Sequence, residues 1–248
     1  VDGGSGRGQH TGGVMTRLLT IPCAGASATM YLRWRRHLPS SVQLVPLEPP
    51  GRGARLGQSF IERFDGLVSW LCQTWQAELQ DRYVLFGHSM GALLAWGMAV
   101  HQRRTGGRMP EALLLSACAA PSQRDPDRFR GLDSDESLMA DLRAQGGTSE
   151  AVFAHPDMLR MTLDTLRADY RVCDSFVHDP DEAPLALPVH VLAGRQDDIS
   201  PGRLEAWRRE TVAPFSITWF EGNHFFIWQE EARVLAHLRS LLSSIQPD

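Results

Sequence analysis

The sequence predicts an α/β fold in which a mostly parallel sheet carries helices on both faces. Short apolar runs alternate along the chain with longer runs whose apolar residues recur every three or four positions, as buried strands and amphipathic helices do. Strands separated by helices throughout favour a doubly wound parallel sheet. The length of 248 residues suits one domain, and 43% hydrophobic and 22% charged residues are ordinary for a globular protein.

The expected elements follow one another along the chain. Buried strands are predicted at residues 17–22, 42–47, 83–86, 112–117, 189–193 and 216–220. Helices are predicted at residues 29–37, 59–80, 90–104, 203–210 and 229–242. The clearest helix is 59–80, because its large apolar residues all lie on one face, which indicates packing against the core rather than a site. We find no internal repeat.

Two segments depart from this alternation. Residues 1–14 are glycine-rich and lack periodicity, so we interpret them as a disordered leader or expression remnant before Met15. A single domain is then expected over residues 15–246. Within it, residues 121–188 are rich in charge and contain short amphipathic runs at 137–143 and 158–169, but no sheet strand. This pattern predicts a helical insertion over the carboxyl edge of the sheet, where a lid would lie.

The composition argues against several classes of partner. A net charge of −4 gives no reason to expect nucleic acid or an anionic membrane as a partner. There is no apolar run of about 20 residues and no signal-peptide core. Four cysteines lie far apart without a C-x-x-C pair, which favours reduced thiols in the cytoplasm over disulfides or a zinc site. Cys72 and Cys118 lie in apolar runs and are expected in the core.

The strongest motif is Gly87-His88-Ser89-Met90-Gly91, which follows a strand and precedes a helix. This is the G-x-S-x-G turn of serine hydrolases in its usual context. The glycines are needed because a Cβ at either flank would collide with the neighbouring strand or helix. The turn lifts the Ser89 hydroxyl out of the sheet and directs the N–H groups of the helix towards a developing oxyanion. The alternative is an ordinary strand–turn–helix with an incidental serine.

A serine nucleophile needs a histidine base and a carboxylate that orients it. In α/β-hydrolases the order along the chain is serine, acid, histidine, each in a loop after a strand. Asp197 follows the strand at 189–193, and His224 follows the strand at 216–220. Asp198 is the alternative acid, but Asp197 stands third after Gly194, the usual spacing. His88 is expected to pack or hydrogen-bond beneath the turn, because its place beside the nucleophile prevents the geometry of a base.

Two loops after the first strands offer further site residues. The loop that begins Cys23-Ala24-Gly25 has small residues, and such a loop supplies one oxyanion N–H in α/β-hydrolases. We therefore expect the N–H groups of Cys23 and Met90 to form the oxyanion hole, with Ala24 as the alternative to Cys23. A plain tight turn is the other interpretation. The stiff loop at residues 48–55 carries Arg52 and Arg55, which are either solvated or placed to bind a phosphate.

These motifs together resemble the type II thioesterases that accompany polyketide synthases and nonribosomal peptide synthetases. The G-x-S-x-G turn at residues 87–91 alone would suit any serine hydrolase. The loop Pro50-Gly51-Arg52 and the segment Arg167-Ala168-Asp169-Tyr170 narrow the resemblance to the type II thioesterases. In that family the motif at residues 21–26 usually begins with Phe and ends in Gly-Gly, whereas this chain begins it with Ile21 and ends it with Ala26. The resemblance covers residues 15–242 and is carried by residues 21–26, 50–55, 86–92, 166–170 and 222–226.

The resemblance implies an α/β-hydrolase fold with a helical lid and an editing activity in antibiotic biosynthesis. Such an enzyme hydrolyses stalled or wrong acyl groups from the phosphopantetheine arm of acyl or peptidyl carrier proteins, without a metal or organic cofactor. Ser89, Asp197 and His224 would form the triad, and Ala24 would contact the substrate. Arg52, or alternatively Arg55, would meet the phosphate of the arm or the acidic carrier. The alternatives are an esterase acting on small esters or acyl-CoA, an acyltransferase or cyclase, and a catalytically silent binding module.

Overall fold

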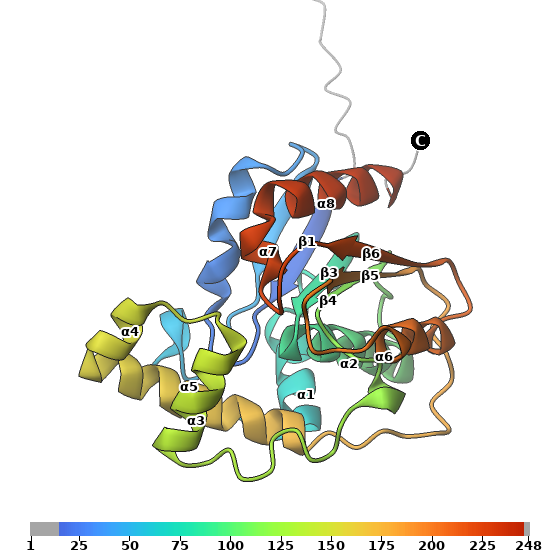
Figure 1. Ribbon diagram of the computed structural model, residues 1–248. Coiled ribbons are helices and arrows are strands. Elements are labelled where there is room, and N and C mark those ends of the chain that lie inside the picture. Colours follow the sequence, from blue (N-terminus) through green and yellow to red (C-terminus); the bar gives the residue numbers. More distant parts are fainter. Residues whose placement is uncertain (1–14, 246–248) are drawn as a thin grey trace, which may run out of the picture.

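The computed structural model describes residues 15–245, so the expected leader at residues 1–14 lies outside the described residues. Its centre is a six-stranded sheet in the order β2-β1-β3-β4-β5-β6, and every neighbouring pair is parallel (Figure 1). The strands are β1 Thr16–Ile21, β2 Val42–Pro46, β3 Tyr83–His88, β4 Leu113–Ser116, β5 Val189–Gly194 and β6 Phe215–Phe220. The predicted parallel α/β sheet is confirmed, with each strand within two residues of its expected bounds.

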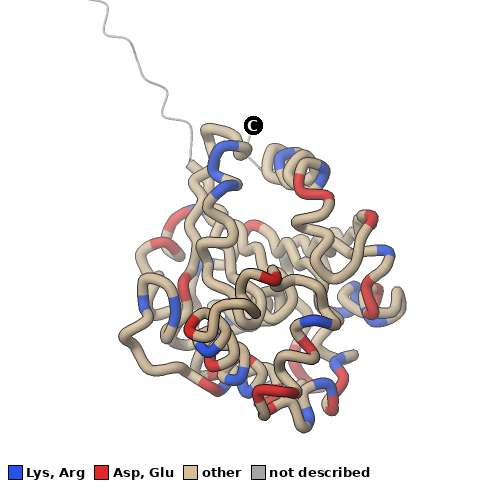
Figure 2. Tube along the Cα trace, turned by 60° about the vertical axis from the view of Figure 1, so that its left-hand side comes forward, with Lys and Arg blue, Asp and Glu red and all other residues tan. Residues whose placement is uncertain are grey.

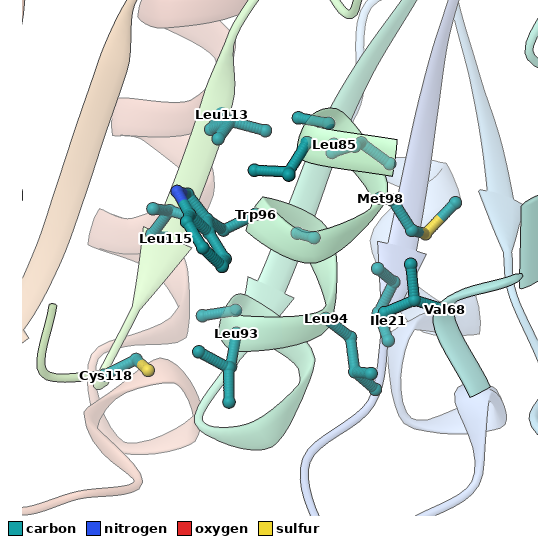
Figure 3. Close-up of a cluster of buried hydrophobic side chains, with 14 of the residues drawn as sticks. Ile21, Val68, Leu85, Leu93, Leu94, Trp96, Met98, Leu113, Leu115 and Cys118 are labelled. Carbon is teal, nitrogen blue, oxygen red and sulfur yellow. The ribbon is translucent and has the colours of Figure 1, made fainter. Parts of the chain in front are cut away.

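Both faces of the sheet are covered, because successive strand residues point to opposite sides. Leu19 packs in a cluster with α1 (Phe64–Thr74) and α2 (Met90–Thr105). Leu18 packs in a second cluster, on the other face, with the 3-10 helix η1 (Ala28–Arg36) and α8 (Glu231–Ile245). Figure 3 shows α2 against the strands, with side chains such as Leu93 and Leu94 buried between helix and sheet. The sheet is therefore a rigid platform for the loops at its carboxyl edge.

The segment between β4 and β5 is helical where it is regular. It contains η3 (Pro121–Gln123), α3 (Asp135–Gln145), α4 (Glu150–Ala154) and α5 (Pro156–Asp174), of which α3, α4 and α5 form a group beside the sheet (Figure 1). α3 and α5 bury a small apolar cluster of their own, and ion pairs such as Arg128–Asp141 at 2.9 Å tie the segment together. Acidic and basic stretches are interspersed along the chain (Figure 2), so many charges find partners nearby.

Some helices differ from their expected form. The helix expected at residues 59–80 is shorter, because the N–H of Phe64 binds the Ser175 hydroxyl at 2.8 Å and Trp75 leaves helical geometry. Trp75 and Leu79 are nevertheless buried. The apolar pattern therefore extends beyond the last helical residue, which made the helix look longer in the sequence than it is. The segment expected as a helix at 29–37 is a 3-10 helix. The last two expected helices are each divided, into α6 (Pro201–Glu205) with η4 (Ala206–Glu210), and α7 (Phe226–Gln229) with α8.

The four cysteine side chains are all buried. Cys72 and Cys118 are buried in the core, as expected, and all four cysteines are free thiols. Burial raises the pKa of Cys23 and Cys173 to about 12, so these thiols stay protonated at neutral pH. Within residues 15–245 no helix has both the length and the apolar character needed to cross a membrane.

Candidate active site

Ser89 occupies the turn between β3 and α2 in a strained conformation. Its backbone angles are φ 54° and ψ −117°, a region that residues with a side chain rarely adopt. The N–H of Ser89 donates to the carbonyl of Ser116 on the adjacent strand at 2.8 Å, which helps to fix the turn. The flanking glycines are required by space, since a Cβ on Gly87 would lie 2.0 Å from the carbonyl oxygen of Gly91. The sequence therefore folds locally so that the Ser89 side chain is presented at the carboxyl edge of the sheet.

The same crowding gives a prediction for Gly91. A Cβ there would lie 2.2 Å from the carbonyl oxygen of Ile21, so backbone must move. We expect Gly91→Ala to lower the free energy of unfolding by about 2–3 kcal/mol in urea titrations. Gly57→Ala is the control, because nothing lies within 4 Å of its added Cβ. Equal stabilities of the two variants would contradict the steric explanation.

Asp197 and His224 meet at the ends of β5 and β6. The Nδ1 atom of His224 lies 3.0 and 3.2 Å from the two carboxylate oxygens of Asp197. The two loops approach closely because Gly194 has no side chain, and a Cβ there would lie 2.6 Å from the carbonyl oxygen of Asn223. A hydrogen bond of 2.9 Å from the N–H of Gln196 to the carbonyl of Gly222 joins the loops as well. The imidazole is thereby oriented through Nδ1, which leaves Nε2 for another partner.

The neighbouring carboxylate is placed differently. Asp198 has an exposed side chain, whereas the Asp197 carboxylate is only 5% exposed. Both line the same cavity, but the hydrogen bonds recorded for Nδ1 of His224 go to Asp197. Of the two acids weighed from the sequence, the geometry favours Asp197.

One cavity of about 300 Å³ brings the candidate residues together. Ser89, Asp197 and His224 line it, as do the expected oxyanion residues Cys23 and Met90 and the expected contact residue Ala24. Its wall also contains Phe129 and Tyr170 from the helical segment, so part of this segment borders the cavity. The cavity holds a hydroxyl, a paired imidazole and two candidate amide donors, which are the groups that acyl transfer requires.

The loop after β1 is held by a buried ion pair that the sequence reading did not identify. Arg52 binds Asp169 through two hydrogen bonds of 2.6 Å, and the two side chains are 6% and 1% exposed. The same carboxylate accepts the N–H of Gly25 at 2.8 Å, and Arg52 donates to the carbonyl of Ala26. The N–H of Gly25 is thus occupied, which leaves Cys23 and Ala24 as the candidates for an oxyanion donor on this loop.

This position does not support the expected contact between Arg52 and a phosphate, because the guanidinium is turned into the protein. Burial disfavours its charge, but Asp169 and Glu48 outweigh that effect, so the pKa of Arg52 lies above its ordinary value. Arg55 stacks over Trp70 and Trp75 at about 5 Å from each ring. The sequence patterns did not identify Asp169 as the partner of Arg52. The only sequence signal for it was its place in the Arg-Ala-Asp-Tyr segment.

His88 lies beneath the turn that carries Ser89, as expected. It is fully buried, its Nδ1 is 2.9 Å from the Ser116 hydroxyl, and its ring centre is 5.2 Å from that of His224. Its Nε2 atom is buried and has no hydrogen-bond partner among the described residues. Burial, and secondarily the nearby His224, hold the pKa of His88 well below its usual range. His88 is therefore a neutral packing partner of His224.

A buried neutral histidine makes stability depend on pH. The unfolded chain takes up a proton at this residue as the pH falls below about 6.5, while the folded state does not, so stability is lost with acidification. Between pH 6.5 and 5 we expect the free energy of unfolding of the wild type to fall more steeply than that of His88→Gln, with a difference in slope that approaches about 1.4 kcal/mol per pH unit near pH 5. His190 and His237, whose pKa values burial also lowers, contribute equally to both proteins. Parallel urea-derived slopes would show that His88 titrates normally in the fold.

Comparisons with known proteins agree with this geometry. The family model described as "Thioesterase domain" matches residues 16–242. Thioesterase PikA5 of Streptomyces venezuelae is 33% identical over 219 residues, covering 86% of this chain and 77% of that protein. The structure of RedJ, a thioesterase from the prodiginine pathway of Streptomyces coelicolor, aligns with a TM-score of 0.83 at 33% identity, over 92% of this chain and 90% of RedJ. BorB, the type II thioesterase from the borrelidin biosynthetic cluster, aligns with a TM-score of 0.83 at 33% identity, over 97% and 96% of the two chains. This chain therefore belongs to the thioesterase family and has the α/β-hydrolase fold of its relatives.

Proposed function

We propose that this protein is a type II thioesterase that removes stalled or wrong acyl groups from carrier proteins of a polyketide or nonribosomal peptide assembly line. The observation that carries the proposal is the shared cavity, in which strained Ser89 and the Asp197–His224 pair lie together in a chain of the thioesterase family. The relatives PikA5 and RedJ are thioesterases, and RedJ acts in the prodiginine pathway. The partners would be carrier proteins bearing acyl-phosphopantetheine. Four free cysteines suit a reducing cytoplasm.

The chemistry divides into two half-reactions. His224 takes the proton of the Ser89 hydroxyl as the oxygen attacks the thioester carbonyl, and the N–H groups of Met90 and of Cys23 or Ala24 hold the oxyanion. Collapse of the tetrahedral intermediate breaks the C–S bond, and the imidazolium gives its proton to the departing thiol. His224 then removes a proton from water as the water oxygen attacks the acyl-serine carbonyl. Collapse of this second intermediate breaks the bond to Oγ of Ser89, the imidazolium returns its proton to Oγ, and the carboxylic acid is released. Asp197 keeps Nδ1 protonated and stabilises the imidazolium throughout.

The strained turn assists this reaction. Because the backbone of Ser89 is already fixed, its hydroxyl needs little rearrangement to reach the reacting carbon. The N–H of Met90, the first residue of α2, lies at the positive end of the helix dipole. A negative oxygen at that place is stabilised in the transition state more than a neutral carbonyl oxygen is in the ground state, which accelerates the chemical step.

Intact-mass spectrometry of an acetyl-loaded carrier protein tests the proposal. We expect the wild type to remove the acetyl mass, whereas Ser89→Ala should reduce the rate by at least about 10³-fold because the covalent step is lost. A serine-directed fluorophosphonate should label the wild type at Ser89 and not the variant. If the carrier stays loaded while a simple ester is cleaved, the protein is an esterase and the editing role is wrong. If neither substrate is cleaved and Ser89 is not labelled, the fold is a catalytically silent binding module.

A further inference from the structure

One glutamine side chain joins the loop after β5, which carries Asp197, to the loop after β6, which carries His224. We call these the acid loop and the histidine loop. Gln196 stands directly before Asp197, and Gly222 stands two residues before His224. The N–H of Gly222 donates to Oε1 of Gln196, and the carbonyl of Gly222 accepts the backbone N–H of Gln196 at 2.9 Å. Both backbone polar groups of Gly222 are therefore held by one residue of the acid loop.

The side-chain amide of Gln196 is itself fixed in one orientation. Its Nε2 donates to the carboxylate of Glu221 at 3.0 Å, so its Oε1 is the atom that faces the N–H of Gly222. A carboxylate at position 196 could not donate to Glu221, and an ammonium there could not accept from Gly222. The contact to the histidine loop therefore depends on an amide at this position.

Gly222 needs such an outside contact because of its own conformation. Its φ is 111°, which residues with a side chain rarely adopt, and a Cβ there would lie 2.2 Å from Oε1 of Gln229. Glycine is thus required just before His224, but glycine is also the residue with the most conformational freedom. The two hydrogen bonds to Gln196 restrict that freedom.

The other side-chain bonds of the histidine loop lie within that loop and the helix α7 that follows it. The N–H of Asn223 donates to Oε1 of Gln229 at 3.0 Å, and the N–H of Phe225 donates to Oδ1 of Asn223 at 2.9 Å. These bonds fix the shape of the loop but not its distance from Asp197. In the described part of the chain, the recorded side-chain bond from the acid loop to the backbone of the histidine loop is that of Gln196.

The contact between Asp197 and His224 tolerates little movement of either loop. The distances of 3.0 and 3.2 Å from Nδ1 to the two carboxylate oxygens lie towards the long end of the range for hydrogen bonds. An outward shift of the histidine loop by about 0.5 Å would take both oxygens beyond that range. A residue that holds the two loops together therefore controls the orientation of the imidazole.

We propose that Gln196 is a positioning residue for hydrolysis, which keeps the imidazole of His224 against Asp197 by holding the backbone of Gly222. The inference rests on the serine mechanism proposed above. The amide of Gln196 is engaged by the histidine loop, so it acts on the orientation of the base and not on the binding of the substrate. Its effect is therefore on kcat, while KM is little changed.

Steady-state kinetics of Gln196→Ala test the proposal. We expect kcat on an acetyl-loaded carrier protein to fall at least about fivefold, and KM to change less than about threefold, because a small misplacement of the base slows proton transfer. Arg195→Ala is the matched control in the same loop, since its exposed side chain pairs with Glu221 at 3.2 Å and makes no recorded bond to the backbone of the histidine loop. Its kcat should change less than about twofold. A loss below about fivefold in Gln196→Ala, or equal losses in the two variants, would overturn the proposal.

An exchange of donor and acceptor tests whether the bond to Gly222 is the decisive contact. Gln196→Glu keeps an oxygen that accepts the N–H of Gly222, but this carboxylate faces that of Glu221. Gln196→Glu/Glu221→Gln supplies the amide donor from the other side, so both bonds can form again. We expect kcat of this double variant to lie within about threefold of the wild type. A larger loss would contradict the assigned role, and this holds even if Gln196→Ala fails to fold.

Proton NMR of His224 gives a readout that does not depend on turnover. Its Nδ1 proton, held by Asp197, should give a resonance far downfield of the amide region in the wild type and in Arg195→Ala. We expect this resonance to broaden or disappear in Gln196→Ala, because a looser pair exchanges its proton with water. An unchanged resonance there would show that Gln196 does not position the imidazole.

The same measurements separate this inference from the proposed function. If the wild type cleaves p-nitrophenyl acetate but no carrier-bound thioester, the editing role is wrong, and the losses of kcat on the simple ester still decide the role of Gln196. If the wild type cleaves neither substrate, the proposed function fails altogether. The resonance of His224 then decides whether Gln196 holds the imidazole against Asp197.

Discussion

Asp197→Asn should lower kcat for thioester hydrolysis by about four orders of magnitude. The amide fits the same space and still reaches Nδ1 of His224, at 3.0 to 3.2 Å in the native structure. An amide NH₂ group donates where the carboxylate accepts, so it favours the histidine tautomer with the proton on Nε2. That tautomer cannot accept the proton of Ser89, and no negative charge remains to stabilise the imidazolium.

Asp198→Asn provides the matched control. Its side chain is exposed and lines the same cavity, yet it makes no recorded hydrogen bond to His224 among the described residues. We expect kcat to change less than threefold in steady-state assays on one acyl-carrier substrate. A large loss in Asp198→Asn together with a small loss in Asp197→Asn would exchange the roles of the two acids.

Asp169→Asn should lower the free energy of unfolding by about 3–5 kcal/mol, because it leaves the guanidinium of Arg52 buried without a counter-charge. Urea titration measures this loss. Arg171 provides the control on the same helix, since its ion pair with Glu62 at 2.8 Å is exposed. Arg171→Ala should cost at most about 1 kcal/mol.

The double variant Arg52→Met/Asp169→Leu separates stability from catalysis. It replaces both charges by apolar groups, so most of the stability lost in Asp169→Asn should return. The N–H of Gly25 would still lack its acceptor, and the loop beside the oxyanion donors would be less well fixed. We therefore expect kcat of the double variant to be at least tenfold below that of the wild type, while KM changes little. Recovery of both stability and kcat would show that the pair acts on the fold alone.

The sequence was sufficient for the parallel sheet and for the set of candidate residues in the cavity. Both follow from local patterns, because the strand, the tight turn and the helix around Ser89 are contiguous in the sequence, from Tyr83 to Thr105. Asp197 and His224 each follow a strand. Because parallel strands bring their carboxyl ends to one edge of the sheet, the topology places these two residues at the same edge.

The sequence was less informative where long-range contacts decide the structure. The N-terminal end of α1 depends on Ser175, and the pairing of Arg52 depends on Asp169, 117 residues further along the chain. An arginine in a Pro-Gly-Arg loop has the same local pattern whether it points to solvent or into the protein. Only the packing of α5 against the loop after β1 distinguishes the two.

The salt bridge between Asp169 of α5 and Arg52 in the loop after β2 limits how this enzyme can be engineered. Exchange of the segment between β4 and β5 with that of a relative is an obvious route to a new acyl preference. Asp169 lies within that segment, whereas Arg52 and Gly25 lie outside it. A grafted segment without an aspartate at the equivalent position would leave Arg52 buried without a counter-charge, and the N–H of Gly25 would lose its acceptor. Chimaeric proteins should therefore take both the segment between β4 and β5 and the loop that carries Arg52 from the same parent protein.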